Sequence, residues 1–190
     1  MTNSTQATQL SGAVLRAAIG FSLVSLLIFA TVAFAERWMY TRLTEAGAYL
    51  VWTLAFILLG GAVLGSLVSD NRWRLPKFYL LWGLAFFAYA AGWVCAYFVL
   101  RGGAGEWVGS LVGSVLMAIV FALGFGAPRL IPKLSLFLFL SNSAGYFVGS
   151  AINNSVGGRG GMLLWGVVYG LFLGAGIGAL LHQLQAGRRD

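Results

Sequence analysis

Six long apolar segments constrain this chain more than any other feature of its sequence. They lie at about residues 17–35, 47–68, 78–100, 107–127, 134–153 and 162–183. A bilayer core about 30 Å thick is crossed by roughly 20 helical residues, so each segment is long enough to span it. Apolar residues make up 59% of the chain and charged residues 9%. This composition excludes soluble and disordered proteins, because both carry far more charge.

We therefore predict an all-α, polytopic integral membrane protein: a compact bundle of six transmembrane helices, with residues 1–190 as one transmembrane domain. The expected connections of about 6 to 11 residues are too short for a water-soluble domain. An alternative is that 17–35 is a cleaved signal, because Ala33-Phe34-Ala35 resembles a cleavage site. Its apolar run is longer than that of a typical signal, so we expect a retained helix.

The basic residues predict the orientation of the bundle. Alternate connections place eight Lys and Arg on one side and four on the other, and the richer side is expected to be cytoplasmic. The richer side holds Arg16, Arg72, Arg74, Lys77, Arg129, Lys133, Arg188 and Arg189, and the poorer side holds Arg37, Arg42, Arg101 and Arg159. We expect the plasma (inner) membrane, with both termini cytoplasmic. The net charge of +7 then reflects topology and lipid headgroups rather than nucleic-acid binding.

A stripe of glycines predicts where two helices approach closely. Gly166, Gly170, Gly174 and Gly178 recur every four residues within 162–183, so they share one helix face in the manner of a glycine zipper. Glycine allows two backbones to pack together in a membrane. The partner is either another helix of this chain, which we favour, or a second subunit.

Groups that carry chemistry are few. No segment has a charge near its middle, and the chain has one histidine, His182, and one cysteine, Cys95. These do not provide a nucleophile with its base, nor a cluster of metal ligands. We expect a protein that is not an enzyme and holds no metal, and no motif names a cofactor.

The segment 134–153 is the most polar of the six, with Asn142, Ser143 and Tyr146 near its middle. An amide in hydrocarbon needs hydrogen-bond partners, so Asn142 is expected to face the bundle interior. Two interpretations stand: a ligand site, as in transporters with thinned helices, or a hydrogen bond between helices that holds the bundle together.

Aromatic residues follow one face of the segment 78–100, at Trp82, Phe86, Tyr89, Trp93 and Tyr97. Such a wall can stack a flat ligand, and it can equally be ordinary packing. Glu36 begins the first outward connection and is the acidic residue best placed to line an entrance. The candidate ligand-binding residues are therefore Asn142, Ser143, Tyr146, Tyr89, Trp93 and Glu36.

Two functions fit these features. The first is binding or transport of a small molecule in a cavity lined by 78–100 and 134–153. The second is a non-catalytic structural or assembly subunit of a larger membrane complex. The expected partners are the lipid bilayer, a small-molecule ligand, and a membrane protein or a second copy of the chain. A lipid-modifying enzyme is disfavoured by the missing catalytic groups.

In size and in its number of expected spans, the chain is similar to the substrate-binding components of energy-coupling-factor vitamin transporters. Those components contact their partner through small residues in the first helix. Ala13 and Ala17, four residues apart, occupy the corresponding place here. The resemblance implies that these two alanines face a partner protein.

Overall fold

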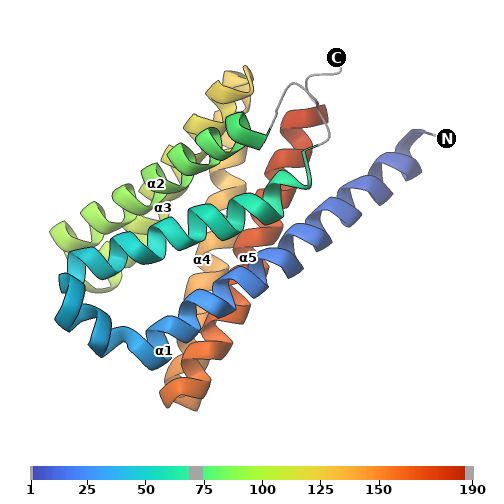
Figure 1. Cartoon of the computed structure of the whole chain (residues 1–190). Coiled ribbons are helices and arrows are strands. Elements are labelled where there is room, and N and C mark those ends of the chain that lie inside the picture. Colours follow the sequence, from blue (N-terminus) through green and yellow to red (C-terminus); the bar gives the residue numbers. More distant parts are fainter. Residues whose placement is uncertain (1, 69–74, 187–190) are drawn as a thin grey trace.

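The computed structural model describes residues 2–68 and 75–186 (Figure 1). The regular elements in these residues are helices: α1 (Thr2–Gly65), α2 (Leu75–Leu100), α3 (Gly102–Gly124), the 3-10 turn η1 (Pro128–Leu130), α4 (Ile131–Val156) and α5 (Gly158–Ala186). Over this part of the chain, five helices are long and apolar enough to cross a membrane. The protein is thus an all-helical, multi-pass membrane protein.

The prediction of six separate helices is wrong in its count. The first two expected segments both belong to α1, which is interrupted by one non-helical residue, Thr44 (φ 64°, ψ 169°). The outward connection expected to begin at Glu36 is helical up to this residue. Residues 36–43 contain neither glycine nor proline, so nothing in them ends the helix.

Thr44 divides α1 into a first arm, residues 2–43, and a second arm, residues 45–65. The arms run antiparallel, blue and then teal in Figure 1. The Trp52 indole of the second arm donates a hydrogen bond to the Thr31 hydroxyl of the first, over 2.9 Å. The two apolar segments therefore lie side by side as a helical hairpin.

The two other connections at this end of the bundle are equally tight. Arg101 alone joins α2 to α3 (φ 56°, ψ 162°), and Gly157 alone joins α4 to α5 (φ 72°, ψ 170°). Thr44 has nearly the same backbone conformation, which glycine adopts freely and other residues rarely. These connections are shorter than predicted, because at each of them at least one helix extends beyond its apolar segment, as α3 does by beginning at Gly102.

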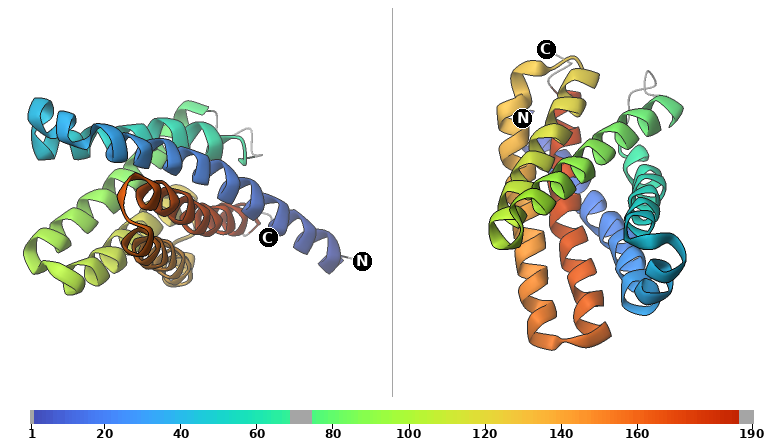
Figure 2. Two further views of the ribbon diagram at one scale, coloured as in Figure 1. Left: turned by 90° about the horizontal axis from the view of Figure 1, so that it is seen from below. Right: turned by 90° about the vertical axis from the view of Figure 1, so that its left-hand side faces the viewer.

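The helices pack in a closed ring. The first arm of α1 packs on α5, α5 on α4, α4 on α3 and α3 on α2. The ring closes where Trp82 of α2 donates a hydrogen bond from its indole to the Ile57 carbonyl of the second arm, over 2.9 Å. Figure 2 shows α2–α3 and α4–α5 as two antiparallel pairs beside the α1 hairpin.

The glycine stripe lies at the contact between α5 and the first arm of α1, and consists of Gly166, Gly170, Gly174 and Gly178. A Cβ atom added at Gly170 would lie 2.5 Å from the Cα of Ser22, so the two backbones are almost in contact. At Gly178 it would lie 2.7 Å from the Cβ of Ala17. Ala17 is fully buried against α5, so the expectation that it faces a partner protein is wrong.

Four arginines of the basic-residue pattern lie at the end with the three tight turns: Arg37, Arg42, Arg101 and Arg159. Arg101 and Arg159 are in or next to the turns themselves. Four residues of the richer side, Arg72, Arg74, Arg188 and Arg189, lie outside the described residues.

Gly170→Ala should destabilise the bundle by about 1–3 kcal/mol, because the new methyl group forces the α1 and α5 backbones apart. The measurement is thermal unfolding of the purified protein in detergent. Gly160→Ala is the matched control in the same helix, since its nearest atom would be 3.8 Å away. This control should be neutral or stabilising, and an equal loss in both variants would contradict the close contact.

Thr44→Gly should stabilise the protein by about 1 kcal/mol, because glycine relieves the positive φ at the cost of a weak cap to the Gly47 amide. Thr41→Gly, three residues earlier within the helix, should instead lose about 0.5–1 kcal/mol. The same unfolding experiment compares them. Equal destabilisation would mean that α1 does not fold back at Thr44.

Candidate functional site

A buried polar network occupies the centre of the ring. The Tyr89 hydroxyl of α2 donates to Asn142 Oδ1 of α4 over 2.7 Å, and the Tyr169 hydroxyl of α5 donates to the same oxygen over 3.2 Å. Asn142 Nδ2 donates to Ser110 Oγ of α3 over 2.7 Å. Ser110 Oγ lies 2.7 Å from Ser143 Oγ. One amide thus connects four helices.

The network satisfies the hydrogen-bonding needs of Asn142 within the bundle. Its side chain is 1% exposed, and both its oxygen and its nitrogen have partners on neighbouring helices. Ser143 is also buried and bonded to Ser110. Of the two interpretations of Asn142, this geometry supports the hydrogen bond between helices.

A cavity of about 350 Å³ lies beside this network. Its described lining consists of Ile28, Phe29, Val32, Glu36, Tyr40, Tyr49, Trp52, Thr53, Phe56, Phe86, Tyr89, Ala90, Trp93, Val94, Tyr146, Met162, Trp165 and Tyr169. These residues come from both arms of α1 and from α2, α4 and α5. The expected lining by 78–100 and 134–153 is thus incomplete, since 134–153 contributes Tyr146 and α1 and α5 supply most of the rest.

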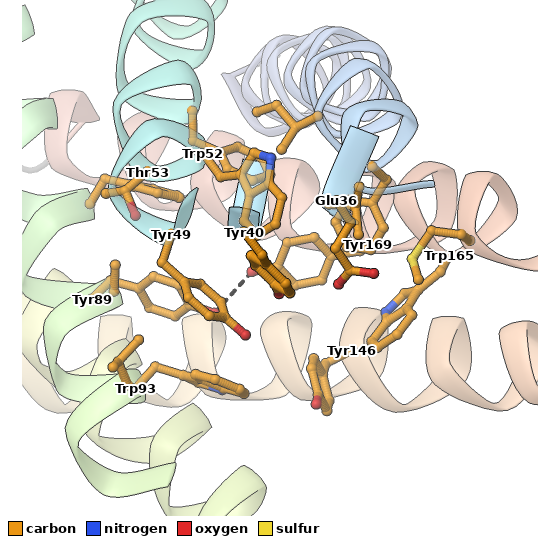
Figure 3. Close-up of a pocket in the computed structure, with 18 residues that line it drawn as sticks. Glu36, Tyr40, Tyr49, Trp52, Thr53, Tyr89, Trp93, Tyr146, Trp165 and Tyr169 are labelled. Atoms are coloured by element: carbon orange, nitrogen blue, oxygen red, sulfur yellow. Dashed lines mark hydrogen bonds between the residues drawn. The ribbon is translucent and has the colours of Figure 1, made fainter. Parts of the chain in front are cut away.

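Aromatic rings form the walls of the cavity (Figure 3). Trp52 packs edge to face on Tyr49 and Tyr40, with ring centroids 5.6 and 6.0 Å apart. Across the cavity, Tyr146 lies between Trp93 and Trp165, with centroids 5.8 and 5.5 Å apart. The walls are therefore large, flat and mostly apolar.

Glycines on neighbouring helices hold these rings in place. A Cβ atom at Gly109 of α3 would lie 3.0 Å from the Trp93 carbonyl oxygen, and one at Gly113 would lie 2.9 Å from the Tyr89 carbonyl oxygen. Gly145 of α4 approaches the Tyr169 carbonyl in the same way, at 3.1 Å. The helix α2 therefore packs against the glycines of α3, and α5 packs against those of α4.

Tyr89 and Tyr169 form the boundary between the network and the cavity. Their hydroxyl oxygens are 2.9 Å apart, the hydrogen bond dashed in Figure 3. Each ring lines the cavity while its hydroxyl reaches Asn142. A ligand against these rings would therefore touch the residues that tie the helices together.

Polar groups in the cavity wall are few. Glu36, on the first arm, is exposed and turns its carboxylate toward the rings (Figure 3). The Tyr146 hydroxyl donates to Glu106 Oε1 over 3.2 Å. Within the described part of the chain, Trp165 Nε1 is buried without a hydrogen-bond partner. This nitrogen packs against Gly149 of α4 and is not open to the cavity. The lining therefore offers the Glu36 carboxylate and the hydroxyls of its tyrosines and of Thr53.

The structure divides the six candidate ligand-binding residues into two groups. Glu36, Tyr89, Trp93 and Tyr146 line the cavity. Asn142 and Ser143 lie behind its wall, in the network. Their role as ligand contacts stays a prediction.

Sequence reasoning missed seven aromatic lining residues: Phe29, Tyr40, Tyr49, Trp52, Phe56, Trp165 and Tyr169. Tyr49, Trp52 and Phe56 are spaced by three and four residues, which places them on one helix face. Trp165 and Tyr169 each precede a glycine of the stripe. The spacing could have identified each of these two helix faces. It does not indicate that the two faces lie against the same cavity.

No protein-family model matches the chain, and no curated protein or solved structure matches it either.

Asn142→Leu should destabilise the protein by about 1–3 kcal/mol, because buried hydroxyls on three other helices lose their partner. Asn154→Leu is the matched control, since Asn154 is exposed on the same helix. It should change the stability by less than about 0.5 kcal/mol. Unfolding midpoints in detergent check both variants, and equal midpoints would contradict the role of Asn142 in joining the helices.

Proposed function

We propose that this multi-pass membrane protein binds a small, largely apolar molecule in the aromatic cavity. The observation that carries the proposal is the cavity itself, whose volume of about 350 Å³ falls within the roughly 300–1,000 Å³ of small-molecule sites. Such sites have apolar and aromatic walls with a few polar groups. This cavity has that composition, with the Glu36 carboxylate, the Thr53 hydroxyl and several tyrosine hydroxyls as its polar groups.

The proposal is binding rather than catalysis. The described lining residues offer a carboxylate, a threonine hydroxyl and tyrosine hydroxyls, and they include no serine, cysteine, histidine or lysine. The cavity lies toward the end with the three tight turns. By the positive-inside count that end is outside the cell, so the proposed ligand enters from the extracytoplasmic side. Transport would require the ring of helices to open at the opposite end as well.

A structural or assembly subunit is the second candidate. It draws on an exposed apolar stripe along the first arm of α1, formed by Leu15, Ile19, Leu23 and Leu27. Each of these side chains is more than half exposed. Acyl chains cover such a stripe in any membrane protein, whereas an aromatic cavity with a carboxylate is not required for packing. We therefore favour the binding function.

Native mass spectrometry of the protein released gently from its own membrane tests the proposal. We expect a bound small molecule at a fixed stoichiometry. Val94→Trp should remove it by filling the cavity, because Val94 is part of the lining. Val99→Trp is the matched control on the same helix, because Val99 is 79% exposed outside the cavity. It should keep the molecule.

Two results would count against binding in the cavity. If both tryptophan variants keep the small molecule, it binds elsewhere. If the protein releases with other polypeptides and without a small molecule, it is a subunit of a complex.

A further inference from the structure

The charge at the cavity wall is negative. Of the described residues that line the cavity, Glu36 alone is charged. Two arginines at the same end lie over aromatic rings that are not part of the lining: Arg101 is 4.5 Å from the ring centre of Phe98, and Arg159 is 4.8 Å from that of Phe34. The two other arginines at this end, Arg37 and Arg42, are not part of the lining either. The described lining therefore contains no positive charge beside Glu36.

Several hydrogen-bond donors of the lining are already used inside the protein. The Tyr89 and Tyr169 hydroxyls share two acceptors, Asn142 Oδ1 and each other's oxygen, so both of their protons are engaged. The Tyr146 proton is directed to Glu106, and the Trp52 indole proton to Thr31. These groups present ring faces and oxygen lone pairs to the cavity, and the Trp165 N–H is closed off from it.

Aromatic rings with committed donors form a suitable environment for a cation. The face of an aromatic ring carries partial negative charge, and it attracts ammonium groups within about 6 Å of its centre. Tryptophan is the strongest partner, and desolvation increases the attraction. Three tryptophans line this cavity, Trp52, Trp93 and Trp165, together with the Glu36 carboxylate.

We propose that the ligand is an organic cation, with an ammonium group near Glu36 and an apolar body among the aromatic rings. This inference rests on the proposed function and specifies its ligand class. A neutral apolar molecule would gain no electrostatic attraction from the exposed Glu36 carboxylate, whereas an ammonium group would. An anion would meet both that carboxylate and the negative ring faces.

Benzyltrimethylammonium is the probe, and neopentylbenzene, with carbon in place of the charged nitrogen, is its neutral isostere. Binding is measured by calorimetric titration of the full chain in phosphatidylcholine nanodiscs, which carry no anionic lipid. We expect the cation to bind about tenfold or more tightly than the isostere. Glu36→Gln should remove most of this preference.

Glu45→Gln is the matched control, because Glu45 is exposed on the second arm and is not part of the lining. It removes one negative charge from the same end of the bundle, so it measures how much the overall charge of the protein contributes to cation binding. It should preserve the preference for the cation. Equal losses in the two variants would show that the preference comes from the surface charge rather than from Glu36, and would overturn the proposal.

The outcomes distinguish failure of the cationic ligand from failure of small-molecule binding in the cavity. Equal binding of cation and isostere, unchanged by Glu36→Gln, would overturn the cationic ligand while binding in the cavity stands. If neither probe binds, the molecule found by native mass spectrometry decides: a cation lost in Val94→Trp supports the inference, and a neutral or anionic one overturns it. Absence of any bound molecule would overturn both proposals.

Discussion

At most contacts between helices of this bundle, a glycine on one helix faces the backbone or an aromatic ring of the other. In a bilayer the hydrophobic effect does not drive helices together, so stability depends on van der Waals contact and hydrogen bonds at such close approaches. The stripe on α5 brings Gly170 to the backbone of the first arm of α1. The glycines of α3 and α4 also position the cavity wall, because α2 and α5, whose rings line the cavity, pack against them.

The polar network depends on the same close packing. Asn142 can reach Ser110 on α3 and the two tyrosines on α2 and α5 because the glycine faces bring these helices together. Tyr89 and Tyr169 then belong to the network and to the cavity wall at once. A ligand that moves either ring would disturb the hydrogen bonds that join four helices. Binding in the cavity would therefore be coupled to helix positions, which is what a transporter requires.

The turn at Thr44 connects backbone strain with the site. Thr44 and Arg101 hold a conformation that costs a non-glycine residue of the order of 1–3 kcal/mol. Tyr40 and Tyr49, on either side of Thr44, both line the cavity. Contacts between the two arms, such as the hydrogen bond from Trp52 to Thr31, hold this conformation in place. The strained turn thus brings two parts of the aromatic wall together.

The sequence alone determined that the chain is helical and lies in a membrane, because the length and composition of each apolar segment decide these properties locally. It also identified the glycine face of α5, the need of Asn142 for partners, and the aromatic face at Tyr89 and Trp93, since all three follow from residue type and helical spacing. Only the tertiary structure decided which faces meet. Spacing along one helix carries no information about the neighbour, so the contribution of α1 and α5 to the cavity was not predictable. The sequence predicted the two arms of α1 as separate spans, but the tight turn at Thr44 was missed for a similar reason: packing between the two arms stabilises a turn conformation that the local sequence disfavours.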